Sequence, residues 1–227
     1  MKVGVLFSGG KDSVYSAYLS KLNGDDIRCL ISLDSKNKYS YMFHTPSIAN
    51  VSILAEAMEI PILIKKTEGI KEKELEDLEN IILDAKNKYK IEGIVSGAIM
   101  SVYQSSRIKK TCDKLNLKLI NPLWQKEQLK LLDELIKNNF HVLIIGVFAY
   151  PLNKTYLGRK IDSKLIQELK ELNEKYKISL IGEGGEFESL VLSCPLYKKH
   201  ISIVGFEDFC DGENSFYREL KLKIKNE

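Results

Sequence analysis

The stretch that decides the fold lies at the start of the chain: Val3-Gly4-Val5-Leu6-Phe7-Ser8-Gly9-Gly10-Lys11-Asp12-Ser13. Its apolar first half predicts a buried strand, and the apolar residues from Val14 to Leu19 predict a helix directly after it. Glycines between a strand and a helix let the backbone adopt positive φ, so that successive N–H groups converge. Because a helix N-terminus also carries partial positive charge, this order of elements predicts an anion-binding turn.

The residue types within this turn indicate phosphate chemistry. The hydroxyls of Ser8 and Ser13 can donate to phosphate oxygens, Lys11 brings a compact positive charge, and Asp12 is placed to hold a magnesium ion. The spacing fits neither a Walker loop nor a Gly-x-Gly-x-x-Gly dinucleotide fingerprint. The alternative explanation is an ordinary strand-to-helix turn with a Ser or Asp cap.

Length and composition set the broad class. The chain has 227 residues, 44% of them apolar, which suffices for one large domain or two small ones. Its 34 basic and 31 acidic residues give a net charge of +3, so no polyanionic partner is demanded and nucleic acid is not expected. We find neither an 18-residue apolar run nor a signal-peptide pattern, and therefore expect a cytoplasmic protein without membrane contact.

The four cysteines are Cys29, Cys112, Cys194 and Cys210, with no Cys-x-x-Cys pair and no zinc-site spacing. Reduced, mostly buried thiols are the default for such a pattern. This weakens sulfur transfer as a function without excluding it, because Cys194 and Cys210 can still meet in space.

Strand-like and helix-like segments alternate through the first two thirds of the chain. Strands are expected near 27–33, 61–64, 92–98, 117–120 and 142–147, with helices between them. This alternation predicts an α/β fold with a doubly wound, mostly parallel sheet. Ligands of such sheets collect at the carboxyl ends of the strands, where we expect Ser8, Asp34, Gly97 and Phe148.

The pattern changes toward the C-terminus. An amphipathic helix is expected over 162–176, followed by short strands at 189–192, 200–204 and 216–224. We therefore expect two units: an ATP-binding domain over residues 1–124 and a smaller α+β substrate-binding lobe over residues 125–227.

Four further segments are rich in polar residues or glycine beside expected strand ends: Ser40 to Pro46, Ser96 to Arg107, Asn121-Pro122-Leu123-Trp124, and Gly182-Glu183-Gly184-Gly185-Glu186-Phe187-Glu188-Ser189. Together with Ser8 to Ser13 they resemble the diphthine–ammonia ligase family, in its short archaeal form. This is a family of N-type ATP pyrophosphatases, or PP-loop proteins, with an adenine nucleotide α-hydrolase-like fold. The resemblance covers about residues 1–205.

The resemblance implies a reaction. Family members convert the carboxylate of diphthine, on translation elongation factor two, to the amide of diphthamide. They use ATP, Mg²⁺ and ammonium, pass through an acyl-adenylate, and release AMP and pyrophosphate. No glutaminase domain is evident, so free ammonium is the nitrogen source that the resemblance implies. A monomer and a homodimer are both compatible with it.

Residue roles follow by matching the motifs. The resemblance implies that Ser8, Gly9, Gly10, Lys11 and Ser13 cradle the pyrophosphate and that Asp12 holds Mg²⁺. It places Gly97 and Ala98 beside the adenosine, and His44, in a polar loop, near the nucleotide. Gln104 and Arg107 share a helix face with Tyr103 and are expected to point at the α-phosphate or the substrate carboxylate. Without the family match, Arg107 is a surface helix charge.

Three glutamates, Glu183, Glu186 and Glu188, are expected to bind and deprotonate ammonium or to hold the trimethylammonium group of diphthine. On an extended segment the carboxylates of Glu186 and Glu188 would face one way. By our own inference, the aromatic residues Tyr41, Phe43, Trp124 and Phe187 are candidates for cation–π attraction to that group. By turn statistics alone, the segment is a glycine hairpin with exposed glutamates.

One residue departs from the family pattern, because Val102 stands where an acidic residue is expected. Two other functions therefore stay open. One is a PP-loop RNA-modifying enzyme that adenylates a base, which for sulfur chemistry needs a functional cysteine. The other is a non-catalytic sensor that binds AMP or ATP without turnover.

Overall fold

The computed structural model describes residues 1–37, 50–70 and 73–225. Its elements, in chain order, are β1 (Lys2–Leu6), α1 (Lys11–Leu22), β2 (Asp26–Ser35), α2 (Val51–Met58), β3 (Ile62–Thr67), α3 (Lys73–Tyr89), β4 (Gly93–Val95), α4 (Val102–Lys114), β5 (Lys118–Ile120), α5 (Gln128–Lys137), β6 (His141–Val147), the 3-10 helix η2 (Lys154–Tyr156), α6 (Ser163–Tyr176), β7 (Phe187–Ser193), β8 (Ile201–Cys210) and β9 (Phe216–Ile224). None of these helices is long and apolar enough to span a membrane.

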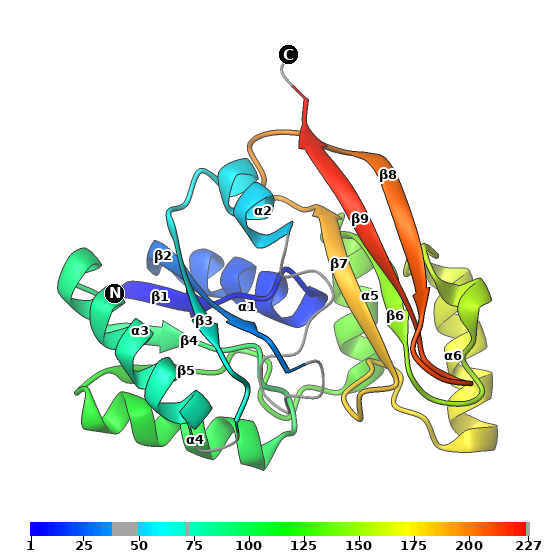
Figure 1. Ribbon diagram of the computed structural model, residues 1–227, viewed down its shortest axis with the longest axis horizontal. Coiled ribbons are helices and arrows are strands. Elements are labelled where there is room, and N and C mark those ends of the chain that lie inside the picture. Colours follow the sequence, from blue (N-terminus) through cyan, green and yellow to red (C-terminus); the bar gives the residue numbers. More distant parts are fainter. Residues whose placement is uncertain (38–49, 71–72, 226–227) are drawn as a thin grey trace.

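The first sheet is parallel throughout, with strand order β3-β2-β1-β4-β5. Helices α3 and α4 cover one of its faces through a core that includes Ile82, Ile94 and Ile108. Helix α1 packs on the other face and also contacts β7. Figure 1 shows α1 lying between this sheet and the strands of the second one. The predicted doubly wound α/β architecture is confirmed.

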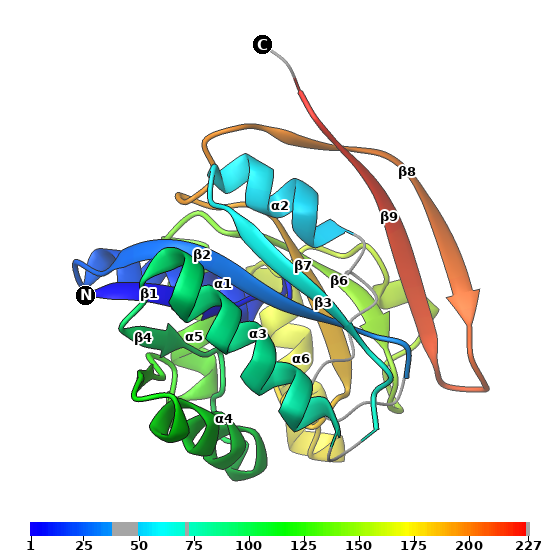
Figure 2. The ribbon, with the colours of Figure 1, turned by 60° about the vertical axis from the view of Figure 1, so that its left-hand side comes forward.

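The second sheet has strand order β7-β6-β9-β8, and its strand pairs are antiparallel. Helices α5 and α6 pack against each other beside it, while α2 contacts β9 (Figures 1 and 2). This sheet and its helices form the C-terminal α+β lobe expected from the sequence. Figure 2 shows β8 and β9 as a long ribbon at the margin of the molecule.

One expected strand has a different place. The segment Val142 to Val147 does form a strand, but β6 lies in the second sheet and pairs with β7 and β9, so its expected place in the parallel sheet is wrong. Six of its seven residues are buried. A continuous apolar run is typical of parallel strands, but it fits equally a central antiparallel strand that is covered on both faces. Phe148 therefore follows a strand of the C-terminal lobe, and not a strand of the parallel sheet as expected.

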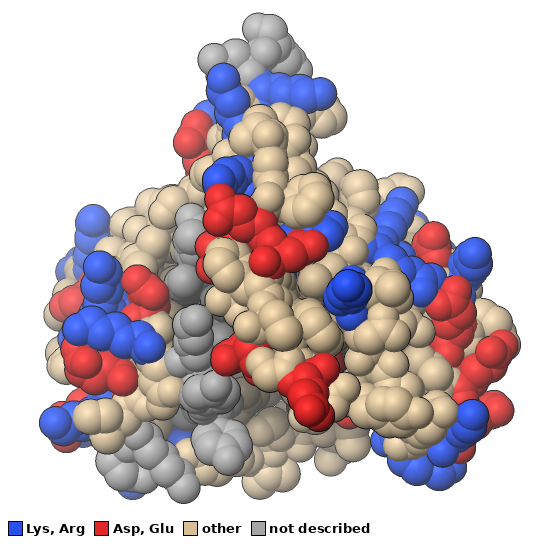
Figure 3. Space-filling view, turned by 45° about the vertical axis from the view of Figure 1, so that its right-hand side comes forward, with Lys and Arg blue, Asp and Glu red and all other residues tan. Residues whose placement is uncertain are grey.

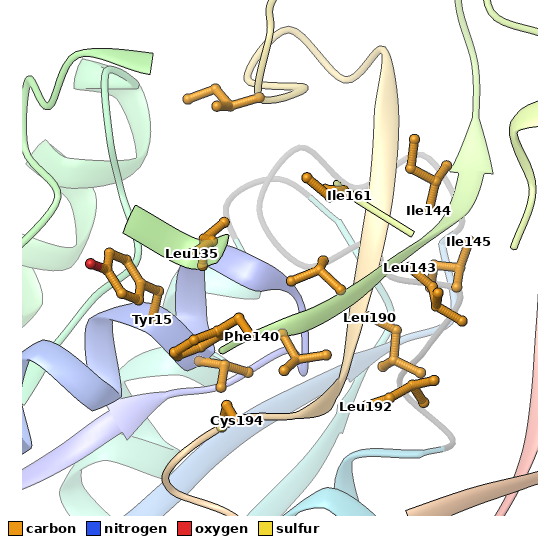
Figure 4. Packing of buried hydrophobic residues seen from close by; sticks show 14 of the residues in the cluster. Tyr15, Leu135, Phe140, Leu143, Ile144, Ile145, Ile161, Leu190, Leu192 and Cys194 are labelled. Carbon is orange, nitrogen blue, oxygen red and sulfur yellow. The ribbon is translucent and has the colours of Figure 1, made fainter. Parts of the chain in front are cut away.

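A single large hydrophobic core joins the two sheets. It runs from Val3 and Val5 of β1 through α1 to Leu190 and Val191 of β7. Figure 4 shows Tyr15 of α1 beside Phe140 and Leu135 of the C-terminal half, and the rings of Tyr15 and Phe140 meet edge to face at 5.3 Å. Packing along this core fixes how the ends of β1 and β7 face each other.

Candidate nucleotide and acyl-transfer site

The glycine turn lies where the topology predicts a ligand. From β1 the chain proceeds to β2 on one side, while β4 pairs on the other, so the ends of β1 and β4 flank the switch point of the sheet. Ser8 follows β1, and Ser96 and Gly97 follow β4. The turn and the segment after β4 are thus neighbours at the carboxyl edge.

Hydroxyl groups brace the turn from within. Ser8 and Ser13 have their Oγ atoms 3.2 Å apart, the backbone N–H of Ser8 donates to Ser13 Oγ, and that of Gly10 donates to Ser8 Oγ. Gly9 has φ +80°, a backbone conformation that favours glycine. No described residue accepts from the N–H groups of Asp12 and Ser13, which lie in the first turn of α1. The turn therefore presents helix N-terminal amides, as phosphate binding requires.

Lys11 points away from the open side of the turn. Its side chain is 4% exposed, and Nζ donates to the carbonyl oxygen of Ile181 and, at 3.0 Å, to Asp12 Oδ2. Nζ also lies 5.3 Å from the ring centroid of Phe187. In this arrangement the lysine binds the C-terminal lobe, so a direct contact with phosphate would require it to leave these partners.

Asp12 fits a metal-ligand role by its unpartnered oxygen. Oδ2 pairs with Lys11, while Oδ1 is buried and has no hydrogen-bond partner among the described residues. The described residues contain no group of three or more His, Cys, Asp or Glu side chains that could hold a metal. A magnesium ion here would thus take this one carboxylate together with substrate phosphates, which is the usual arrangement for Mg²⁺.

Gly97 packs against the start of α1. A Cβ atom on Gly97 would lie 3.0 Å from the carbonyl carbon of Asp12 and from the nitrogen of Ser13. Its missing side chain is therefore explained by the approach of the helix. Ala98 is buried, and its N–H donates to Ser96 Oγ. Contact of these two residues with adenosine stays a prediction.

Glu183 links the loop 179–186, which leads into β7, to the first domain. Its Oε1 accepts from the N–H groups of Met100 and Ser101, at 3.0 and 3.1 Å, just before α4 begins. Burial raises the pKa of this carboxyl, and the nearby charge of Asp12 raises it further, while the amide of Met100 opposes the shift. Glu183 therefore lies close to the phosphate turn, with one oxygen engaged in holding the segment after β4.

Glu186 bonds to backbone amides of its own loop, residues 179–186. Its two oxygens accept from the N–H groups of Ser179 and Gly184, at 2.8 and 2.9 Å. Strand β7 begins one residue later, at Phe187, so the alternation of side chains along a strand does not relate Glu186 to Glu188. These two hydrogen bonds stabilise the conformation of the loop.

Glu188 belongs to β7 and has a strongly shifted pKa. Burial raises the pKa of its carboxyl to about 8, although the positive charge of Lys11 opposes this. Desolvation disfavours the charged form of a carboxyl group, and a nearby cation favours it. Such a pKa near neutrality is common for groups that exchange protons in active sites.

Gln104 and Arg107 lie near the start of α4, which Ser101 caps by accepting from the N–H of Gln104. The guanidinium carbon of Arg107 lies 3.5 Å from the ring centroid of Tyr103, a close stacking contact. Val102 is 69% exposed at the first position of the helix. The predicted neighbourhood of Arg107 and Tyr103 is thus present, and their roles toward substrate stay predictions.

Other candidates fall in different places. His44, Tyr41 and Phe43 lie outside the described residues. Trp124 lines a shallow hollow beside α4 and β5, together with Lys109 and Asn121. Phe187 is 3% exposed and contacts the Lys11 ammonium. Of the described aromatic candidates, Phe187 lies at the turn.

Sequence reasoning missed two partners of the turn. Ser189 Oγ accepts from the N–H of Lys11 at 3.2 Å, and the N–H of Val191 donates to the carbonyl of Gly9 at 3.0 Å. Both residues lie on β7, far from the turn along the chain. Ser189 ends the motif Gly182 to Ser189, but its own spacing carries no signal that distinguishes it from a serine facing solvent.

The fold and these contacts define a class: an α/β protein with a glycine turn at the switch point of its parallel sheet, hydrogen-bonded to a C-terminal lobe. Comparison with known proteins identifies the family. The model of the diphthamide synthase N-terminal domain matches residues 1–119, and that of the diphthamide synthase C-terminal domain matches residues 127–224.

Individual relatives agree with this match. The diphthine–ammonia ligases of Bos taurus and Homo sapiens are each 35% identical over 251 residues, covering 99% of this chain and 94% of each relative. The diphthine–ammonia ligase of Schizosaccharomyces pombe is 33% identical, and the match covers 100% of this chain and 40% of the longer fungal protein. The chain belongs to the diphthine–ammonia ligase family, a family of ATP-dependent ligases.

A solved structure is also similar at the level of overall shape. It is described as a predicted subunit of tRNA methyltransferase from Methanocaldococcus jannaschii. It is 18% identical in sequence, with a TM-score of 0.44 over 86% of this chain and 98% of that one. At this distance the likeness has no bearing on function.

Proposed function

We propose that this protein completes diphthamide on translation elongation factor two by converting the carboxylate of diphthine to an amide with ATP and ammonium. The observation that carries the proposal is the braced phosphate turn in a chain that matches the family over both of its domains. A carboxylate is a poor acyl donor, so it attacks the α-phosphate of ATP and pyrophosphate leaves. Ammonia then attacks the acyl-adenylate, giving the amide and AMP.

The phosphate turn would serve the first step. The N–H groups of Asp12 and Ser13 at the start of α1 offer hydrogen bonds to the departing pyrophosphate, where negative charge increases. Asp12 Oδ1 would hold Mg²⁺, which when bound offsets phosphate charge. The catalytic contribution of the protein is then positioning and charge stabilisation, with no covalent nucleophile.

The glutamates would serve the second step. Ammonium must lose a proton before it can attack. A carboxyl with a pKa of about 8 is ionised in part near neutral pH, and its ionised form is a stronger base than an ordinary carboxylate and accepts that proton. Among the three glutamates we assign this role to Glu188, because burial raises the pKa of its carboxyl to about 8 and the Lys11 ammonium of the turn is the charge that acts on it. Gln104 and Arg107 would orient the substrate carboxylate or the α-phosphate.

The RNA-modifying alternative is weakened by Cys194 and by the surface charges, whereas the assay below separates the ligase from a nucleotide sensor. Cys194 is buried and burial raises the pKa of its thiol to about 12, which disfavours the nucleophilic thiolate that sulfur transfer needs. Figure 3 shows Lys and Arg interspersed with Asp and Glu on this face, with no continuous basic surface among the residues that it colours.

One assay tests the proposal. Purified protein is incubated with Mg-ATP and isotopically labelled ammonium, with and without elongation factor two carrying diphthine, and AMP and protein-bound label are measured. We expect AMP to form only with the factor, and label to appear in its modified histidine. AMP formation stimulated by RNA instead would show an RNA-modifying enzyme. Tight ATP binding with no AMP from either acceptor would contradict the ligase reaction and favour a sensor.

A further inference from the structure

The phosphate turn is attached to the C-terminal lobe through its backbone. Val191 donates to Gly9, and Lys11 donates to the hydroxyl of Ser189. Ser189 and Val191 are neighbours on the same face of β7 and are 7% and 0% exposed. The turn is therefore hydrogen-bonded to β7, the edge strand of the second sheet.

The side chain of Lys11 makes a second attachment to the same lobe. Its ammonium donates to the Ile181 carbonyl and lies over the Phe187 ring, in a place where it is 4% exposed. An ammonium is costly to bury without partners. Here the carbonyl, the aromatic ring and Asp12 together supply those partners.

The turn has little room to shift between its neighbours. A Cβ on Gly10 would lie 3.3 Å from the carbonyl oxygen of Ser189, and one on Gly97 would lie 3.0 Å from the backbone of Asp12 and Ser13. The turn is thus enclosed between β7 on one side and the segment after β4 on the other. Side chains at Gly10 or Gly97 would therefore push the turn away from these neighbours.

These bonds decide which amides can meet a phosphate. The N–H groups of Ser8, Gly10 and Lys11 are engaged by Ser13, Ser8 and Ser189. Those of Gly9, Asp12 and Ser13 have no acceptor among the described residues. An incoming anion would therefore meet the first turn of α1, at a place set by the bonds behind it.

We infer that Ser189 and Lys11 are positioning residues for ATP: the Ser189 hydroxyl fixes the backbone of the phosphate turn, and Lys11 anchors it to the loop 179–186 instead of contacting phosphate. This inference rests on the ATP site of the proposed function. Ser189 would then act in nucleotide binding through the backbone of the turn, without contacting the nucleotide itself.

The test measures the affinity for a non-hydrolysable ATP analogue with Mg²⁺ by calorimetry, and the ATP KM where turnover is available. Ser189→Ala removes the acceptor, Ser189→Thr keeps a hydroxyl, and Ser193→Ala changes an exposed serine on the same strand. We expect Ser189→Ala to weaken binding about fivefold or more. Ser189→Thr and Ser193→Ala should stay within about twofold of the wild type.

The Lys11 part has its own readout. Lys11→Met should weaken binding while leaving its salt dependence unchanged, because no charge–phosphate contact is lost. A flattened salt dependence would show that Lys11 contacts phosphate, and would overturn the anchoring role. Thermal melting of each variant shows whether it is folded, and if Ser189→Ala does not fold, Lys11→Met decides the matter.

Other outcomes are equally decisive. Wild-type affinity in folded Ser189→Ala, or equal losses in Ser189→Ala and Ser189→Thr, would overturn the role of the hydroxyl while leaving the proposed function intact. Failure of the wild-type protein to bind the analogue would overturn both the inference and the ATP site on which it rests.

Discussion

Two residues of the phosphate turn can be tested singly. Ser8 bonds to Ser13 and to the Gly10 amide, and Asp12 offers a buried oxygen without a described partner. We expect Ser8→Ala and Asp12→Ala to lower pyrophosphate release about 100-fold or more, because the first removes a hydroxyl that shapes the turn and the second removes the carboxylate proposed to hold Mg²⁺. Both should keep the wild-type circular dichroism spectrum.

The matched control is Asp26→Asn, which changes an exposed aspartate at the start of β2. It should leave pyrophosphate release at the wild-type level. Turnover retained by Ser8→Ala and Asp12→Ala would rule out the proposed role of the turn.

Glu188 makes stability depend on pH. Its carboxyl has a pKa of about 8 in the folded protein against an ordinary value of 4.5, so the folded state holds a proton that the unfolded state releases. Stability should therefore fall as pH rises from about 4.5 to about 8, by at most ~1.4 kcal/mol per pH unit, and then level off.

Glu188→Gln should remove this decline, because an amide stays neutral throughout. Urea unfolding midpoints at pH 5 to 9 measure the difference between the two proteins, with the exposed Glu219→Gln as control. Parallel curves for the wild type and Glu188→Gln would contradict the shifted pKa.

At the scale of elements, the loop 179–186 holds the start of α4. Glu183 accepts from the amides of Met100 and Ser101, and Ser101 in turn caps the helix. Glu183→Ala leaves these amides without their acceptor and should destabilise the protein by ~1–3 kcal/mol. Hydrogen exchange at Met100 and Ser101 should accelerate accordingly.

A comparable cap elsewhere serves as control. Glu127 accepts from Leu129 and Lys130 at the exposed start of α5. Glu127→Ala should cost about 1 kcal/mol and leave exchange at Met100 unchanged. If Glu183→Ala leaves that exchange unchanged as well, Glu183 does not hold this segment.

At the scale of the molecule, the two lobes share one core. Val3 and Val14 belong to the same cluster of buried residues as Leu131 and Val191. We expect a single cooperative unfolding transition in calorimetry, because separating the two sheets would expose the apolar side chains of their shared core to water. Fragments 1–124 and 125–227, produced separately, should lack near-ultraviolet circular dichroism and recover it when they associate.

Two resolved transitions, or a fragment that is folded alone, would show that the lobes are independent. That outcome would also weaken the positioning of the turn by Ser189, since the hydroxyl could then act only when the lobes are docked.

Local sequence determined much of this protein. The strand-like run Phe216 to Ile224 forms β9 as expected, and the expected order of strand, glycine turn and helix is present in β1, Ser8 to Gly10 and α1, because both signals depend on neighbours along the chain. Only the tertiary structure decided that β6 joins the antiparallel sheet, since burial on both faces does not specify a pairing partner. It also brought Ser189 to Lys11 across 178 positions of the chain, a contact that the shared core creates and that no local pattern encodes.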